Sequence, residues 1–233
     1  MLLVIIFASL FTGLLTGSSL YNNDARSRFV LKIITSFSFV VLGVVIIIEQ
    51  KGSFAETYSL SILGALASAF LGDFGLGQYH LSHPINKLDK SHWQEIGFVF
   101  FSLSQIVYII TFFRQFHFYP GYLLVPFIGL ILMFFILTRL KAFNKKRTAL
   151  IMVYTFLLTF MMASTLSAAQ ATGFNNLGIT LCVAGSLFAI SDFTLIFKYY
   201  YHKLRKLTTV VSCITYYAAQ LLFAFSLYFY LSL

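Results

Sequence analysis

Two aspartates lie deep inside long apolar stretches of this chain, and they constrain its fold and its chemistry more than any other feature. Asp73 falls within Leu60–Leu76, and Asp192 falls within Leu181–Phe197. A carboxylate at the centre of a membrane helix costs roughly 2.5–3.5 kcal/mol, so it usually faces a protein interior or a wet cavity. The other five acidic residues fall at predicted helix ends or in loops. The acidic chemistry of the chain therefore has two candidates, and both are intramembrane.

The composition indicates an integral membrane protein. Hydrophobic residues make up 59% of the 233 residues and charged residues only 10%, a balance that soluble domains do not have. Three prolines and no linker-like segment predict a single domain over residues 1–233. The net charge of +9 could suggest nucleic acid, but the basic residues gather on one set of loops, so no nucleic-acid partner is expected.

Eight apolar runs are long enough to cross a bilayer, which takes about 17–25 residues per helix. We therefore predict an all-α integral membrane protein with eight transmembrane helices in one bundle. The predicted spans are Leu2–Leu20, Phe29–Ile48, Tyr58–Gly77, Ile96–Phe113, Tyr119–Leu137, Thr148–Ala168, Gly178–Tyr199 and Leu207–Leu231. The first lacks the basic start and the cleavage site of a signal peptide, so we expect it to be retained.

The basic residues predict the orientation of the bundle. Of the 16 Lys and Arg residues, all but Lys51 and Arg114 fall at the first, third, fifth and seventh connections. Cytoplasmic loops carry most basic residues of membrane proteins, so both termini are predicted to lie outside. The basic residues of the inner side, Lys32 among them, are interpreted as topology signals and as contacts to anionic membrane lipids.

The two aspartates are predicted to share one site. Their helices run in the same direction, and each carboxylate precedes the inner end of its helix by a few residues. The alternative is that each carboxylate caps a neighbouring helix or makes a local polar contact. The two segments also resemble each other, because each contains Asp-Phe-x-Leu and is followed one helix later by a Gln/Tyr pair. This similarity predicts a parallel four-plus-four internal repeat about an axis along the membrane normal, with chance similarity between apolar helices as the alternative.

Helical periodicity places other polar side chains near the carboxylates, because residues three or four apart share a helix face. Ala65, Ala69 and Asp73 form a stripe of small residues that is expected to pack inward. Gln105 and Gln220 are notable because a buried amide must find hydrogen-bond partners. The residues expected to bind or position a substrate are Tyr108, Gln105, Tyr154, Ser191, Tyr217 and Gln220, with Tyr216 as the alternative to Tyr217.

The histidines do not indicate a metal site. They are scattered over loops on both faces, and the pair His80-x-x-His83 lacks a third ligand for zinc. The sequence also has no Gly-x-Ser-x-Gly nucleophile elbow and no glycine-rich phosphate loop. We therefore expect neither a metal nor another cofactor, and a metal-dependent, amidase-like hydrolase would need a histidine cluster that the spans lack.

Three segments resemble the YhhN family of multi-spanning proteins, which includes the lysoplasmalogenases. They are Ala67–Leu76 around Asp73, Ala184–Leu195 around Asp192, and Thr215–Gln220. The Leu-Phe-x-x-Ser-Asp-x-x-Leu and Tyr-Tyr-x-Ala-Gln patterns are specific when they occur in this order and spacing. Two positions depart from the family: Gln105 stands where it commonly has His, and Ile33 follows Lys32 where it usually has Pro. The departure at Gln105 puts full activity or substrate identity in question.

The resemblance implies hydrolysis of the vinyl ether of lysoplasmalogens to a fatty aldehyde and a glycerophospho-base. Protonation of the alkenyl carbon creates an oxocarbenium-like centre, and one carboxylic acid with one carboxylate suffices for such chemistry, as in glycosidases. Asp73 and Asp192 would be the acid and the base or cation stabiliser, in an order that the sequence leaves open. An inner-face lysine, Lys198 or Lys203, would hold the phosphate of the lysophospholipid. We expect asparagine at either aspartate to abolish turnover and to leave folding near normal.

The rival class is a small membrane transporter or lipid-binding protein, because paired intramembrane aspartates can also relay protons or bind a cation. The helices of the two aspartates lack the proline interruption typical of a broken transporter helix, although Gly72, Gly75 and Gly77 leave room for one. The predicted location is the plasma membrane of a bacterium. The sequence makes no prediction of an oligomeric state.

Overall fold

The computed structural model describes residues 2–21, 25–81, 87–139, 145–200 and 205–232, and all regular structure in these ranges is helical. A bilayer-spanning chain needs such a fold, because every backbone N–H and C=O group must be paired internally. The helices are α1 (Leu2–Tyr21), α2 (Ala25–Glu49), α3 (Thr57–Leu81), α4 (Lys87–Gln115), the 3-10 turn η1 (Pro120–Leu123), α5 (Leu124–Arg139), α6 (Lys145–Ala171), α7 (Asn176–Tyr200) and α8 (Arg205–Leu231).

Seven of these helices, α2 to α8, have the length and apolar composition of membrane spans over their described residues. In α1 the apolar stretch that the structure describes is shorter, at Ile5–Ser18. Large apolar side chains also cover the outside, with Leu3 at 81% and Ile131 at 71% exposed. A surface of this kind is stable only against lipid or a partner. The prediction of an all-helical membrane protein is confirmed at this level.

The starts of the fourth and fifth helices differ most from the predicted boundaries. The fourth helix begins at Lys87, well before the predicted Ile96, because the polar residues ahead of the apolar run continue the helix towards the loop. The fifth span was predicted to start at Tyr119, but Pro120 opens the 3-10 turn η1, and α5 begins only at Leu124. Proline fits the first turn of a helix because it has no N–H to offer.

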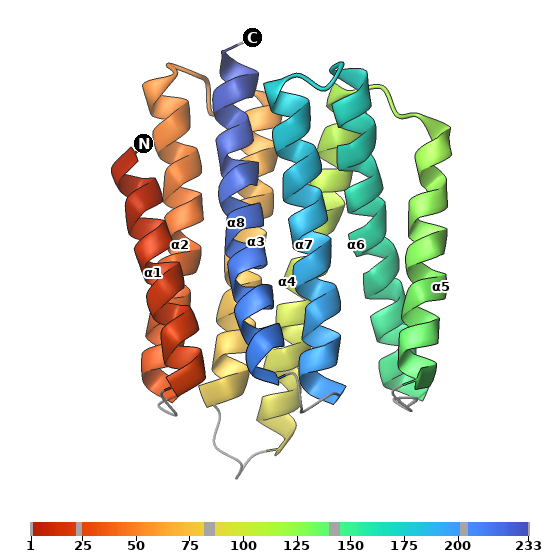
Figure 1. Cartoon of the computed structure of the whole chain (residues 1–233). Coiled ribbons are helices and arrows are strands. Elements are labelled where there is room, and N and C mark those ends of the chain that lie inside the picture. The colour runs from red at the N-terminus through yellow and green to blue at the C-terminus, as the bar shows by residue number, and fades with distance from the viewer. Residues whose placement is uncertain (1, 22–24, 82–86, 140–144, 201–204, 233) are drawn as a thin grey trace.

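The helices pack as an elongated bundle in which α1 and α5 lie at opposite flanks (Figure 1). Neighbours in sequence pack together as α3 with α4 and α7 with α8. Two further contacts cross the bundle, because α2 packs against α8 and α4 packs against α6. The start of α1 and the end of α8 lie at the same end of the bundle (Figure 1). The flanking helices thus enclose an interior made by α2, α3, α4, α6, α7 and α8.

Small residues bring α3 close to its neighbours. A Cβ atom added to Gly75 would lie 2.9 Å from the backbone nitrogen of Gly97, so α3 and α4 are in backbone contact there. Ala65 and Ala69 are fully buried, and Asp73 is 2% exposed. The prediction that this stripe packs inward is therefore confirmed. It places the first carboxylate inside the bundle, where it needs protein partners.

Candidate functional site

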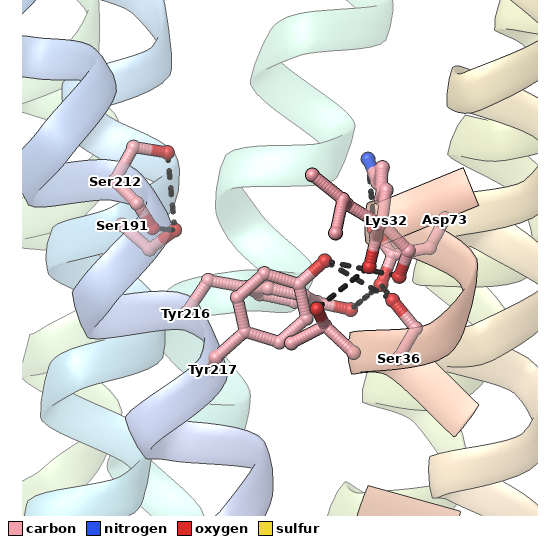
Figure 2. Close-up of polar contacts among 9 residues, drawn as sticks. Lys32, Ser36, Asp73, Ser191, Ser212, Tyr216 and Tyr217 are labelled. Atoms are coloured by element: carbon pink, nitrogen blue, oxygen red, sulfur yellow. Dashed lines mark hydrogen bonds and ion pairs between the residues drawn. The ribbon is translucent and has the colours of Figure 1, made fainter. Parts of the chain in front are cut away.

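The Asp73 carboxylate of α3 is held by three side chains from two other helices, α2 and α8 (Figure 2). Its Oδ1 lies 2.9 Å from the Lys32 Nζ of α2. Its Oδ2 accepts hydrogen bonds from the Ser36 hydroxyl at 2.6 Å and from the Tyr216 hydroxyl of α8 at 2.7 Å. One ammonium and two hydroxyl donors give Asp73 the partners of an ionised carboxylate. This arrangement offsets the cost of placing the charge inside the membrane region.

Sequence reasoning missed the role of Lys32, which was interpreted as a loop cation and a lipid contact. The structure places it as the eighth residue of α2, one turn before Ser36, with its side chain 23% exposed. Residues four apart share a helix face, so both side chains reach the same carboxylate. The signal was present in the sequence, because Lys32 falls inside the apolar run that was itself predicted as the second span.

Tyr217 contacts the Asp73 cluster, which consists of Asp73 and its partners Lys32, Ser36 and Tyr216. Its hydroxyl lies 3.2 Å from the Ser36 hydroxyl and donates to the Lys32 carbonyl at 3.5 Å. The neighbouring Tyr216 ring packs against aromatic residues of three other helices, which limit the orientations that the ring can adopt. These residues are Phe39, Phe101 and Phe188. Both tyrosines therefore belong to the site, whereas the sequence prediction favoured Tyr217 and did not single out Tyr216, the direct donor to Asp73.

The Asp192 carboxylate has a simpler environment. Its Oδ2 accepts a hydrogen bond from the Tyr154 hydroxyl of α6 at 2.5 Å, and no described group bonds its Oδ1. Asp73 and Asp192 interact electrostatically with each other, and Lys32 acts on both. Each aspartate is the seventeenth residue of a 25-residue helix, α3 or α7. The two carboxylates thus face one interior but differ in their partners.

Two amide side chains are buried in the interior of the bundle. Gln105 and Gln220 are both 0% exposed. The Tyr108 hydroxyl donates to the Gln220 Oε1 at 3.2 Å, whereas the Gln220 Nε2 has no hydrogen-bond partner among the described residues. Gln105 interacts with the Tyr154 hydroxyl, but neither of its amide atoms meets hydrogen-bond geometry with any described group. The predicted neighbours Gln105, Tyr108, Tyr154 and Gln220 are thus in the interior.

Ser191 and Lys198 were also predicted to position the substrate, and neither side chain is among the described partners of Asp73. The Ser191 hydroxyl donates to the backbone carbonyl of Ser212 at 3.0 Å and so links α7 to α8, away from the Asp73 cluster (Figure 2). We therefore assign Ser191 to helix packing. Lys198 belongs to the last turns of α7, but its side chain lies outside the described part of the chain, as does the whole of Lys203.

No group of three or more His, Cys, Asp or Glu side chains that could hold a metal occurs in the described ranges. His92 and His117 are exposed, at opposite ends of α4, and His83 and His202 fall outside those ranges. The groups that the interior offers for chemistry are therefore two carboxylates, one ammonium, hydroxyl groups and amides. Such groups can transfer protons and can stabilise a developing positive charge.

Comparison with curated proteins and with solved structures gives no match. The sequence model of the YhhN family matches residues 27–227, which is most of the chain. The match contains every residue of the two carboxylate sites, from Lys32 to Tyr217, and leaves out the whole of α1 and the end of α8. This extent confirms the resemblance seen in the sequence motifs. The chain belongs to the YhhN family.

Proposed function

We propose that this protein is a membrane-embedded hydrolase that cleaves the vinyl-ether bond of lysoplasmalogens to a fatty aldehyde and a glycerophospho-base. One observation carries the proposal: two interior carboxylates at matching helix positions have unlike partners. Acid-catalysed addition of water to an enol ether needs one group that gives a proton and one that stabilises positive charge. Membership of the YhhN family is compatible with this activity.

The contacts support a division of roles between the two aspartates. Asp73 faces an ammonium and accepts two hydroxyl hydrogen bonds, so we assign it as the carboxylate that stabilises the cation. Asp192 accepts from one neutral phenol and has one oxygen without a described partner. We assign it as the acid that protonates the alkenyl carbon. The hydroxyls of Tyr217 and Tyr108 would then contact the glycerol backbone.

An apolar groove offers a place for the alkenyl chain. It has a volume of about 580 Å³ and is lined by residues of α1, α2 and α3, among them Leu3, Phe7, Ile33, Phe37 and Phe70. On α2, Ile33 and Phe37 directly follow Lys32 and Ser36, the partners of Asp73. A hydrocarbon chain in this groove would therefore lie at the same height of α2 as the carboxylate site, on an adjoining face of the helix. The phosphate would reach the basic inner loops, for which Lys198 remains our candidate.

The proposed topology is eight spans with both termini outside, built as a parallel four-plus-four repeat. It is supported by the matching positions of Asp73 and Asp192 in helices of equal length. It is further supported by packing, because α2 lies between α3 and α8 as α6 lies between α7 and α4. The positive-inside rule then puts the basic connections in the cytoplasm. We propose the plasma membrane of a bacterium as the location.

The test is a substrate panel with purified protein. We expect fatty aldehyde from a lysoplasmalogen, and no hydrolysis of the matched alkyl-ether lysophospholipid, in which the carbon that accepts the proton is saturated. The matched acyl-ester lysophospholipid should also remain intact, since no described side chain of this site is an activated serine or cysteine nucleophile. Hydrolysis of the ester at a rate equal to that of the vinyl ether would contradict the proposal.

A second candidate is a transporter coupled to protons or cations, and the Lys32–Asp73 ion pair favours it. Charged pairs inside membrane segments mark ion and proton pathways in many transporters. The hydrolase and transporter functions can be distinguished by the preparation in which each activity is measured. Aldehyde release persists in detergent micelles, whereas transport requires sealed vesicles and a gradient.

A further inference from the structure

Gln105 is the most unusual polar side chain in the interior. It is 0% exposed, and both its Oε1 and its Nε2 lack hydrogen-bond partners among the described residues. Leaving one buried polar group unsatisfied costs about 1–3 kcal/mol. Buried side-chain polar atoms nearly always have a partner in the protein or an ordered water. Two unpartnered atoms on one amide therefore point to a ligand that can both donate and accept a hydrogen bond.

The surroundings of Gln105 offer further partners for such a ligand. The amide interacts with the Tyr154 hydroxyl, which donates to the Asp192 Oδ2 at 2.5 Å and keeps lone pairs free to accept. The Asp192 Oδ1 is bonded by no described group, as noted above. A buried water typically makes about three hydrogen bonds, and these side chains supply that number.

We propose that Gln105 holds a water molecule against the Tyr154–Asp192 pair, and that this water is the nucleophile of the hydrolysis. The part of the inference that concerns catalysis rests on the proposed function. Water suits the site better than a lipid hydroxyl, because the amide atoms of Gln105 are buried and inaccessible. A single water can enter such a place, whereas a glycerol backbone needs an open path.

The proposed reaction consumes one water molecule and regenerates the Asp192 acid. Asp192 gives its proton to the second carbon of the alkenyl chain, which leaves positive charge shared by the first carbon and the ether oxygen. The water oxygen bonds to the first carbon and loses a proton to the Asp192 carboxylate, which restores the acid. The resulting hemiacetal breaks its bond to the glycerol oxygen, which takes up the hydroxyl proton, and releases the aldehyde. Gln105 acts as a positioning residue for the water.

The first test detects the water without any substrate. Hydroxyl radicals made by X-ray irradiation label side chains that lie next to ordered water, and mass spectrometry reads the labelling of Tyr154. We expect severalfold weaker labelling in Gln105→Leu and in Gln105→Met than in the wild type. Gln105→His, which keeps a donor and an acceptor, should restore it. Gln115→Leu is the matched control, because it removes an amide from the same helix away from the carboxylates, where Gln115 accepts from Tyr230.

The labelling of wild-type protein alone also tests whether Tyr154 lies next to a water molecule. Tyr58 is fully buried and its hydroxyl is paired with Ser226, so it provides the baseline for a dry tyrosine. Labelling of Tyr154 no stronger than that of Tyr58 would overturn the proposal, even if every variant failed to fold. Equal labelling of Tyr154 in the wild type and in Gln105→Leu would overturn it as well.

The second test reports which nucleophile captures the cation. In water containing methanol, capture by water gives aldehyde, whereas capture by methanol gives a mixed methyl acetal and a proton. A held water should keep the acetal-to-aldehyde ratio low in the wild type and in Gln115→Leu. Gln105→Leu should raise the ratio and lower turnover by about 10²-fold, because misplacing a reactant by about 1 Å has effects of that size.

An unchanged product ratio in Gln105→Leu would overturn the catalytic role, because a merely structural amide would alter the rate and leave the ratio as it was. The two proposals can fail separately. In one outcome the wild-type protein releases no aldehyde while the labelling of Tyr154 still depends on Gln105. That result would support the water site and contradict the hydrolase function.

Discussion

The ion pair between Lys32 and Asp73 should make the two residues strongly interdependent for stability. Asp73 is 2% exposed, whereas Lys32 keeps 23% of its side-chain exposure. Breaking a buried pair by removing one partner costs about 3–5 kcal/mol, because the other charge stays buried without compensation. Lys32→Met leaves the more buried Asp73 carboxylate without its cation. We therefore expect this variant to lose about 3 kcal/mol or more of its free energy of unfolding.

Asp73→Asn should cost less, at about 2 kcal/mol, because the partly exposed Lys32 can extend its ammonium towards water. The double variant Lys32→Met/Asp73→Asn should lose less than the sum of the two single variants. Coupling energies between contacting residues are about 0.5–3 kcal/mol, and the upper half of that range is expected here. Near-normal folding is therefore expected only for Asp192→Asn, since Asp192 has a single phenol partner.

The assay is reversible unfolding of the purified protein in mixed micelles, with all four members of the cycle measured at one detergent composition. Ser191→Ala provides a control for loss of a polar group elsewhere in the interior. Single-variant costs that add up to the cost of the double variant within about 0.5 kcal/mol would refute the reasoning. A larger loss for Asp73→Asn than for Lys32→Met would refute the argument from exposure.

Four further outcomes are expected. Tyr154→Phe should slow turnover about 10–100-fold, as expected for loss of a hydrogen bond that orients the acid, and near-wild-type turnover would remove Tyr154 from the site. Ser191→Ala should keep its turnover within about twofold, because a packing residue makes no transition-state contact; a large loss would return Ser191 to the site. Turnover should survive extensive chelation, and restoration by one stoichiometric metal after chelation would contradict the Brønsted-acid mechanism. Reporter fusions after Leu233 should read as external and fusions within residues 139–147 as cytoplasmic; the reverse would refute the topology.

Much of the fold was predictable because its signals are local. Apolar runs of membrane-spanning length are read directly from the sequence. The start of α4 at Lys87 and the 3-10 turn at Pro120 were missed, because hydrophobicity marks where the membrane begins and leaves open where a helix begins. Polar residues that continue a helix beyond the bilayer carry no such signal.

The site was predictable in its residues and only partly in its pairings. Asp73 and Asp192 stood out because a carboxylate is costly in hydrocarbon, and helical spacing indicated Gln105, Tyr154 and Gln220. Which donor meets which acceptor depends on how the helices rotate against one another, and a single sequence carries little information on that rotation. The Tyr154–Asp192 and Tyr216–Asp73 hydrogen bonds were therefore not foreseen.

Lys32 was missed for a different reason. The count of basic residues that gave the orientation treated all cations near a predicted inner end as equivalent. A cation within an apolar run is as costly as a carboxylate there, so Lys32 should have been considered together with the aspartates. Ser191 differs from Lys32, because it stands next to Asp192 in the sequence but on another face of α7, where its hydroxyl bonds to Ser212.

The central claim is that both interior carboxylates drive cleavage of a vinyl ether. It is tested most directly by aldehyde release from lysoplasmalogen, measured side by side for purified wild-type protein, Asp73→Asn and Asp192→Asn, each shown to be folded by the unfolding assay. The account predicts that the wild type releases fatty aldehyde and that each variant loses about 10²–10⁴-fold in turnover. Wild-type protein without aldehyde release, or either variant with near-wild-type turnover, would contradict it.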